Sequence, residues 1–282
     1  MKTLVIGAAG QLGLAVVARL AREHEVTPAT RADVDLRNPR ALHAFVLDRR
    51  PQAVINCAAF NNVDASEEDQ EAALDINAFA VGTLSRATAE LGAVLVHFST
   101  DFVFAGTAAT PYTEDDLPEP QSVYAQSKLL GEWVAADNPR HYVFRVESLF
   151  GGPRTRSSVD RIVDAVRAGE PAPVFVDRVV SPSFVDDVVD ACSHVLRTGA
   201  AFGVYHCVNS GAATWLDVGR EIARLLDRPE TALKPISVRD VPLRARRPQY
   251  AALSNAKLAR AGYPMPSWQD ALGRYLNRRY AA

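Results

Sequence analysis

Short apolar runs alternate with longer amphipathic stretches through the first 150 residues of the chain. The apolar runs are rich in Val and Ile and lie at residues 3–8, 25–29, 53–58, 94–100 and 142–146. Such runs are typical of strands buried on both faces of a parallel sheet. The spacing between them predicts helices near residues 11–22, 39–50, 69–91 and 121–137. This alternation predicts an α/β fold with a doubly wound parallel sheet.

The pattern loosens after residue 150, where Gly, Pro and Arg become frequent. The stretches concerned are 151–156, 169–173 and 229–248. We therefore predict a main domain at residues 1–150 and a smaller C-terminal lobe built from residues 151–180 and 204–282. The segment 181–203 contains a helical pattern at 184–198 and is expected to return to the main domain.

Composition excludes several classes of partner. The chain has 282 residues, 48% of them hydrophobic, and a net charge of −2 without a long basic run. Neither nucleic acid nor an anionic membrane is expected as a partner. The six histidines are scattered without metal-ligand spacing, so no metal site is predicted.

The cysteines and the first residues indicate a compartment. Cys57, Cys192 and Cys207 lie in apolar or small-residue runs without a CxxC pair, which favours buried free thiols in a reducing environment. The sequence enters an apolar strand pattern at once, shows no signal-peptide pattern, and has no apolar run of membrane-spanning length. We expect a cytoplasmic protein.

A glycine-rich turn joins the first predicted strand to the first predicted helix. Gly7, Gly10 and Gly13 are spaced GxxGxxG, with Gln11 and Leu12 at the start of the helix. A dinucleotide pyrophosphate needs bare backbone at the positive end of a helix, because a side chain there would block its approach. The strand, turn and helix in this order predict a dinucleotide site and a Rossmann sheet.

The end of the second strand indicates which dinucleotide is bound. Arg31 follows this strand, and no acidic residue ends it. An arginine here accommodates a 2′-phosphate, so NADP(H) is preferred and NAD(H) stays open. Asp35 and Leu36 are assigned to the same cofactor site, although Asp35 could instead cap helix 39–50, and Arg31 could simply be solvated.

Three side chains suggest chemistry at a carbonyl group. Tyr124 and Lys128 are four residues apart in helix 121–137 and therefore share a face. A free phenol has a pKa of about 10, and a nearby ammonium lowers it, which would help Tyr124 to exchange a proton. Thr100, at the carboxyl end of its strand, could bond a carbonyl oxygen. Alternatively, Thr100 caps a turn and the helix carries an ordinary surface lysine.

These motifs together resemble a known family. GAAGQLG (7–13), NCAA (56–59), STD (99–101) and YAQSK (124–128) look like an extended short-chain dehydrogenase/reductase. The longer segments STDFVFAG (99–106), EPQSVYAQSKLLGE (119–132) and RRPQYAALSNAKL (246–258) resemble the dTDP-4-dehydrorhamnose reductase group within it. The resemblance implies NADPH-dependent reduction of a 4-keto group on a nucleotide-linked deoxysugar, with the C-terminal lobe binding the substrate. It leaves a homodimer open.

The resemblance also assigns residues to the site. It implies catalytic roles for Thr100, Tyr124 and Lys128, with Lys128 also holding the nicotinamide ribose. Further cofactor contacts are implied at Cys57, Ala58, Ala59, Asn77 and Ser99, and substrate contacts at Asp101, Phe102, Val103 and Arg247. Cys57 is expected to be a packing residue, since no histidine stands beside it to lower its pKa. Arg247 is expected to meet a diphosphate, which matches a guanidinium fork.

The match to the group breaks at three aromatic positions. Ser148 and Phe150 stand where the group has Trp and Tyr, and Phe102 stands where Tyr is common. Aromatic rings stack on sugars, so the sugar is left open. A nucleotide-sugar epimerase of the same superfamily, or a non-catalytic NADP-binding regulatory subunit resembling the methionine adenosyltransferase partner, remains an alternative. Dehydratases have Glu where Phe102 stands, which argues against dehydration.

Overall fold

A six-stranded parallel sheet forms the centre of the main domain. The computed structural model describes residues 1–154 and 157–280. Its strand order is β10-β5-β4-β3-β1-β2, and each neighbouring pair is parallel. The bounds are β1 (Lys2–Ile6), β2 (Glu25–Ala29), β3 (Ala53–Asn56), β4 (Val94–Thr100), β5 (His141–Val146) and β10 (Gly203–His206). This confirms the predicted doubly wound α/β fold.

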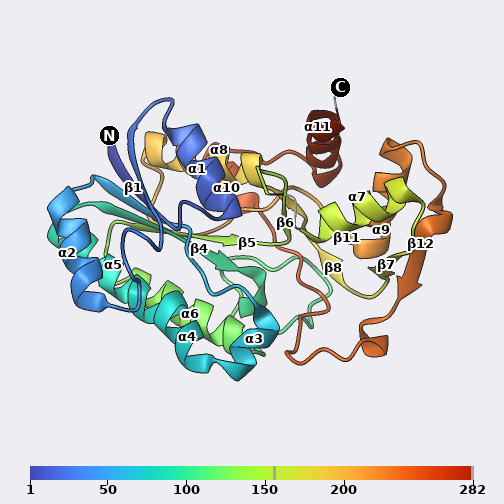
Figure 1. Ribbon diagram of the computed structural model, residues 1–282, viewed down its shortest axis with the longest axis horizontal. Coiled ribbons are helices and arrows are strands. Elements are labelled where there is room, and N and C mark those ends of the chain that lie inside the picture. Colours follow the sequence, from blue (N-terminus) through green and yellow to red (C-terminus); the bar gives the residue numbers. More distant parts are fainter. Residues whose placement is uncertain (155–156, 281–282) are drawn as a thin grey trace.

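Helices cover both faces of the sheet (Figure 1). Alternate strand residues point to opposite faces, so Val5 and Val96 join one core cluster while Leu4 and Leu95 join another. The first cluster packs under α1 (Gln11–Leu20), α8 (Val185–Thr198) and α10 (Ala256–Arg260). The second packs under α2 (Pro39–Arg49), α5 (Ala80–Glu90) and the end of α6 (Val123–Ala135). Burial on both faces explains the mostly apolar runs of the central strands β1, β3, β4 and β5, whereas the edge strand β2 is mostly exposed.

The helix predicted over 69–91 is divided in the structure. It consists of α4 (Gln70–Leu74), a π-helical turn (Asp75–Phe79) and α5, and α3 (Val63–Glu68) precedes it. The π turn lies where α6 approaches most closely: a Cβ on Gly131 would stand 2.1 Å from the carbonyl oxygen of Asn77. Single π turns of this kind often occur near functional sites, and here the turn supports the helix that carries Tyr124.

A second hydrophobic core forms the C-terminal lobe, at the right of Figure 1. Its helices are α7 (Ser158–Ala168), α9 (Trp215–Leu225) and α11 (Trp268–Tyr280). Its paired strands are β7 (Ala172–Phe175) with β12 (Leu233–Ile236), β8 (Val179–Val180) with β11 (Ala213–Thr214), and β6 (Leu149–Phe150) with β9 (Ser183–Phe184). Short 3₁₀ turns lie at Asp101–Val103, Glu230–Ala232 and Val238–Asp240.

The border of this lobe differs from the predicted one. Helix α8 packs on α1, as the predicted return of segment 181–203 requires. The following strand β10 continues to His206 beside β5, so residues 204–206, expected in the lobe, belong to the main sheet. Leu258 and Met265 likewise join the main core. A crossover helix delivers the chain to the edge of a parallel sheet, which makes β10 its sixth strand. Residues 155, 156, 281 and 282, also expected in the lobe, lie outside the described residues.

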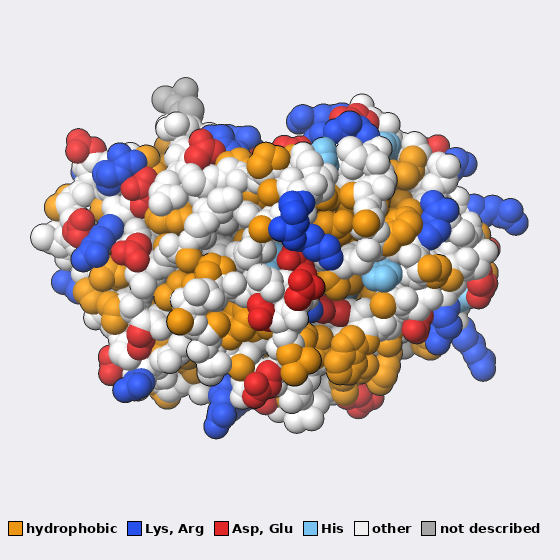
Figure 2. Space-filling view, turned by 180° about the vertical axis from the view of Figure 1, so that it is seen from behind, with side chains coloured by type: hydrophobic (Ala, Val, Ile, Leu, Met, Phe, Trp, Pro, Cys, Tyr) orange, Lys and Arg blue, Asp and Glu red, His pale blue; other side chains and the backbone are white. Residues whose placement is uncertain are grey.

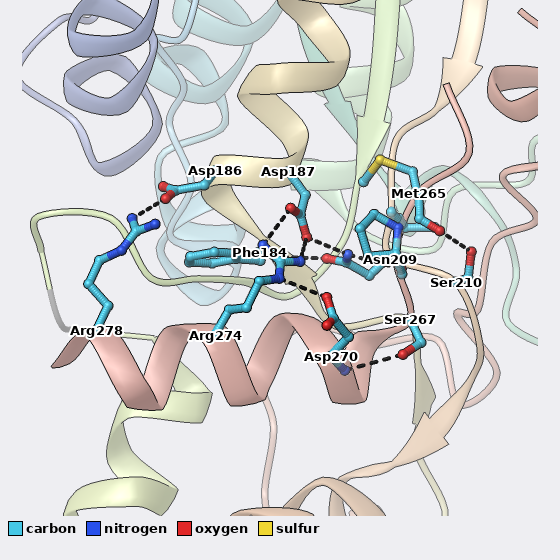
Figure 3. A network of polar contacts seen from close by, with 12 residues as sticks. Phe184, Asp186, Asp187, Asn209, Ser210, Met265, Ser267, Asp270, Arg274 and Arg278 are labelled. Carbon is cyan, nitrogen blue, oxygen red and sulfur yellow. Dashed lines mark hydrogen bonds and ion pairs between the residues drawn. The ribbon is translucent and has the colours of Figure 1, made fainter. Parts of the chain in front are cut away.

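Polar contacts anchor the last helix of the lobe to the main domain (Figure 3). Arg274 of α11 pairs with Asp187 in the first turn of α8 at 2.7 Å, and Asn209 donates to the same carboxylate at 2.7 Å. Arg278 pairs with the neighbouring Asp186. Acidic residues in the first turn also suit the positive end of α8. The lobe is therefore held at the edge of the sheet that carries the candidate site.

The surface drawn in Figure 2 carries charges of both signs. Acidic and basic side chains are interspersed on the face drawn in Figure 2. Within residues 1–154 and 157–280, no helix is both long and apolar enough to cross a membrane.

Candidate active site

The glycine loop lies where the strand order reverses, between the carboxyl ends of β1 and β3. Gly7 has φ +77°, and a Cβ there would stand 2.6 Å from the backbone nitrogen of Ala58. A Cβ on Gly13 would stand 2.2 Å from the carbonyl oxygen of Gly7. Helix α1 then starts after Gly10 with no side-chain cap and no acid in its first turn. Bare amides at a helix N-terminus beside a switch point suit a pyrophosphate.

Gln11 and Leu12 lie in the first turn of α1 but differ in their contacts. The Gln11 side chain donates to the carbonyl oxygen of Gly151 at 2.8 Å, which ties the loop after β6 to the first turn of α1. Leu12 is buried in the main core. Both side chains are engaged elsewhere, so Gln11 and Leu12 can contact a phosphate through their backbone N–H groups.

The segment after β3 runs beside the glycine loop. Cys57, Ala58 and Ala59 are half-buried there, and burial raises the pKa of the Cys57 thiol well above its usual value. That direction agrees with a packing role and not with a nucleophile. Asn77 was expected to contact the cofactor, but its amide bonds both backbone groups of Phe60 and the hydroxyl of Ser127. The structure thus gives Asn77 the role of holding this segment against α6.

The turn after β2 presents the expected cofactor-selecting residues. Arg31 and Asp35 are exposed, and Leu36 is half-buried. The Asp35 carboxylate accepts from the backbone of Arg37 at 2.9 Å, so it shapes the turn before α2. Asn38, and not Asp35, caps α2 by accepting from the Ala41 amide. Asp35 is therefore not the cap of α2. Arg31 is exposed just after β2, whose last residue Ala29 accepts a hydrogen bond from Ala8 of the glycine loop.

Thr100 and Tyr124 meet at the carboxyl end of β4. Thr100 ends β4, and its hydroxyl donates to Asp101 Oδ1 at 2.9 Å. Tyr124 lies in the first turn of α6, with the ring of Phe102 edge-on at 5.7 Å. Burial and the Asp101 charge raise the pKa of Tyr124 to about 12, and hydrogen bonding with Thr100 opposes this shift. A phenol with this pKa is protonated at neutral pH and can donate.

Lys128 was expected to lower the pKa of Tyr124, and the structure assigns it other contacts. Its Nζ donates to the carbonyl oxygen of Phe98 at 2.6 Å and lies 3.3 Å from Nε2 of His97. Burial lowers the pKa of Lys128 itself to about 8. Burial and the Lys128 charge hold the pKa of His97 well below its usual value. The Lys128 ammonium is turned toward the Phe98 carbonyl, and it is not among the groups that shift the pKa of Tyr124.

Ser99 was expected beside the cofactor, but its hydroxyl faces the opposite side of β4 from Thr100. It donates to Glu132, whose carboxylate also takes two bonds from Arg145, at 2.7 and 3.0 Å. Both charged side chains are about 4% exposed. Successive strand residues point to opposite faces, which explains why Ser99 turns inward while Thr100 reaches the edge. Ser99 therefore helps to fix α6 on the sheet.

Two of the predicted substrate contacts, Phe102 and Val103, differ in their exposure. Phe102 is half-buried beside Tyr124, whereas Val103 is fully buried in a small core with Phe104 and Leu129. The Val103 side chain is therefore turned inward by its 3₁₀ turn and does not reach the surface, so a substrate contact through its backbone stays a prediction.

Arg247 lies on the loop that the sequence predicted to meet a diphosphate, and its fork is engaged. It pairs with Asp64 of α3 at 2.8 Å, and a second guanidinium nitrogen bonds the same carboxylate at 3.0 Å. These bonds hold the pKa of Asp64 low, at about 2. Arg244 of the same loop pairs with Glu68. A diphosphate bound by Arg247 must therefore replace Asp64 as its partner.

Several charged residues near the site were not predicted from the sequence. Glu147 follows β5 and is buried, and half-buried Arg178 follows β7 in the lobe. Arg178 acts electrostatically on both Asp101 and Glu147. The buried pair Glu132–Arg145 was also missed. The Arg in RVESLFGG and the Glu in KLLGE could have indicated a pair, since charges in apolar runs are rarely buried alone.

Comparison with known proteins places the chain in a family. The family model described as "RmlD substrate binding domain" matches residues 1–281. A dTDP-4-dehydrorhamnose reductase of Burkholderia thailandensis is 34% identical, and the match covers 97% of each chain. A probable dTDP-4,6-dihydroxy-2-methyloxan-3-one 4-ketoreductase of Streptomyces antibioticus is 37% identical, covering 96% of this chain and 93% of the relative.

Solved structures agree with these relatives. The crystal structure of a dTDP-4-dehydrorhamnose reductase from Clostridium acetobutylicum has a TM-score of 0.93 and 33% identity, covering 99% of both chains. A Bacillus anthracis dTDP-4-dehydrorhamnose reductase in complex with NADP also has a TM-score of 0.93, at 28% identity, covering 98% of this chain and 99% of that one. From the glycine loop to the last helix, the chain belongs to the RmlD substrate binding domain family.

Proposed function

We propose that this protein catalyses the NADPH-dependent reduction of the 4-keto group of a dTDP-linked deoxysugar. The observation that carries the proposal is the meeting of Thr100 with a protonated Tyr124 at the carboxyl end of β4. The names of the relatives support the reaction, and the NADP complex of the Bacillus anthracis reductase supports the cofactor. An epimerase relative at 23% identity shares the fold alone.

The cofactor fits the described residues. The backbone amides of residues 10–13 would receive the pyrophosphate. Gly7 and Gly13 have no room for a side chain, and the first turn of α1 contains no acid. Exposed Arg31 would take the 2′-phosphate through a charge-assisted bond. Ala58 and Ala59 would line the path toward Lys128, which would hold the nicotinamide ribose. When bound, the cofactor supplies the hydride.

Tyr124 and Thr100 act on the substrate oxygen in this proposal. The Thr100 hydroxyl orients the ketone, and Tyr124 gives its phenol proton to the oxygen as the alcohol forms. A pKa of about 12 keeps Tyr124 protonated at neutral pH until the more basic alkoxide develops. Phe102 packs edge-on against Tyr124 and limits the movement of its ring.

The sugar and its diphosphate would lie between the main domain and the lobe. Arg247 would take the diphosphate by leaving Asp64, since a guanidinium fork binds either partner in the same way. Ser148 and Phe150 stand at positions where the resemblance expects larger or more polar aromatic residues, so the sugar preferred here need not be rhamnose. The two relatives named above bear the names of enzymes for different sugars.

A reductase assay tests the proposal. Purified protein is mixed with NADPH and a panel of dTDP-4-keto-deoxysugars, and loss of NADPH absorbance is followed. Tyr124→Phe should lower kcat by about 10² to 10⁴ while NADPH affinity stays within a few-fold. Tyr280→Phe, in α11, is the matched control and should retain activity. The proposal fails if the wild type oxidises NADPH with no member of the panel, or if Tyr124→Phe is nearly as fast as wild type.

Location and assembly complete the proposal. We place the enzyme in the cytoplasm, where its thiols at Cys57, Cys192 and Cys207 would stay reduced. Whether it forms a homodimer is tested by its mass in solution with and without NADPH.

A further inference from the structure

Two buried carboxyl groups follow neighbouring strands near the proposed proton donor. Thr100 of β4 and Val146 of β5 are paired in register, so Asp101 and Glu147 follow at the carboxyl ends of neighbouring parallel strands. Asp101 is 3% exposed and Glu147 is 2% exposed. Buried acids are costly unless their charge is balanced or a proton is retained.

One oxygen of each carboxyl is bonded and the other is not. Asp101 Oδ1 accepts from the Thr100 hydroxyl at 2.9 Å, and Glu147 Oε2 accepts from the amide of Ser181 at 2.6 Å. Asp101 Oδ2 and Glu147 Oε1 are buried without a hydrogen-bond partner in the part of the chain that the structure describes. Buried polar atoms rarely remain unpaired. A single proton held between these two oxygens would satisfy both.

The surrounding charges also favour one retained proton. Arg178 and Tyr124 act on Asp101, and Arg178 and Tyr250 act on Glu147. Among the described residues, Arg178 forms no direct ion pair with either acid, and its Nε bonds the carbonyl oxygen of Pro248. Burial raises the pKa of Asp101 to about 7, and burial together with the Asp101 charge raises the pKa of Glu147 well above its usual value. One proton leaves the pair with a single negative charge, which Arg178 balances.

We propose that Asp101 and Glu147 share one proton, and that Glu147 acts through this pair as a positioning residue for proton donation by Tyr124. The inference deepens the proposed function, because it rests on Tyr124 as the donor. When Tyr124 donates, its O–H bond breaks, an O–H bond forms on the substrate, and a phenolate remains beside Asp101. A second negative charge on the pair would oppose that phenolate, just as the Asp101 charge raises the pKa of Tyr124. The pair keeps its own proton throughout.

The shared proton can be detected without substrate or cofactor. Carboxyl groups of the full chain are labelled with carbon-13 and titrated by NMR from acid to alkaline pH. We expect two carboxyl steps in the wild type: one near pH 7, where the pair passes from two protons to one, and one at higher pH, where the shared proton leaves. The step at higher pH should be absent from Glu147→Gln and move to lower pH in Asp101→Asn, because the charge of Asp101 no longer acts on Glu147. Glu170→Gln removes an exposed acid as the matched control and should keep both steps.

The kinetic consequence is measured in the reductase assay. Wild-type kcat should fall at alkaline pH, where the pair loses its shared proton, because the charge of Asp101 holds the pKa of Glu147 well above its usual value. Glu147→Gln should show no such fall, since its remaining acid, Asp101, carries one charge throughout the range above pH 7. Each enzyme is compared with its own value just above pH 7, and circular dichroism checks that it is folded.

The outcomes separate this inference from the proposed function. If the wild type shows no carboxyl step above neutral pH, or if that step is unchanged in both amide variants, the shared proton is refuted whatever the activity. If wild type and Glu147→Gln have the same pH profile, the link to Tyr124 is refuted. If the titration behaves as expected but no keto sugar is reduced, the pair stands and the proposed function fails.

Discussion

Removing Glu132 should destabilise the protein more than any surface acid. Its carboxylate takes two bonds from Arg145 and one from Ser99, in a place where both charged side chains are about 4% exposed. Two lost charge-assisted hydrogen bonds at about 1.5–3 kcal/mol each give roughly 3–6 kcal/mol. Breaking a buried ion pair by removing one partner typically costs about 3–5 kcal/mol. Glu132→Met should therefore lower the free energy of unfolding by about 3–5 kcal/mol.

Urea unfolding of wild type and variants measures this loss. The double variant Glu132→Met with Arg145→Met should be less destabilised than the sum of the two single variants, because no uncompensated charge remains buried. Glu230→Gln is the control: Glu230 and Arg220 are 60% and 52% exposed, and such pairs contribute less than about 1 kcal/mol. A loss below about 1 kcal/mol for Glu132→Met, or full additivity in the double variant, would refute the reasoning.

Three further predictions concern binding. Arg31→Ala should weaken NADPH far more than NADH in equilibrium titrations, because only NADPH carries the 2′-phosphate; equal losses would remove Arg31 from cofactor selection. Arg247→Ala should raise KM for a dTDP-keto sugar and leave NADPH affinity unchanged, and the same KM as wild type would leave Arg247 as a partner of Asp64 only. Gly13→Ala should weaken NADPH about 5- to 150-fold, the equivalent of about 1–3 kcal/mol of overpacking, because its Cβ would meet the Gly7 carbonyl at 2.2 Å. Gly82→Ala, with its nearest contact at 3.6 Å, is the control, and similar NADPH binding by both variants would contradict the account.

The periodic pattern was sufficient for most of the main domain. Strands β2 and β4 coincide with the apolar runs at 25–29 and 94–100, and α1, α2 and α6 lie within the predicted helical stretches. Central strands such as β3, which is buried at every position, carry a strong local signal because most of their residues are apolar. The edge strand β2 is mostly exposed and carries a weaker one. The glycine loop was equally readable, since the need for bare backbone restricts the residue type at Gly7 and Gly13.

The sequence located the neighbourhood of Thr100 and Tyr124 but not the direction of several side chains around them. Ser99, Asn77 and Val103 occupy motif positions, yet each is turned into the interior. The break of helix 69–91 at a π turn was also unpredicted, because it depends on the close approach of Gly131 on another helix. A motif fixes which residues come near a site, whereas the backbone direction at each position fixes where a side chain points.

The sequence by itself determined the order of elements, the glycine loop and the helical spacing of Tyr124 and Lys128, because each of these depends on residues close together in the chain. Only the tertiary structure decided the partners of the charged groups. It brought Glu147 beside Asp101, Arg145 under Glu132 and Asp64 onto Arg247, across separations of 46, 13 and 183 residues. Burial and long-range pairing set the pKa of a carboxyl or a phenol, and neither quantity is encoded in the local pattern that predicts strands and helices.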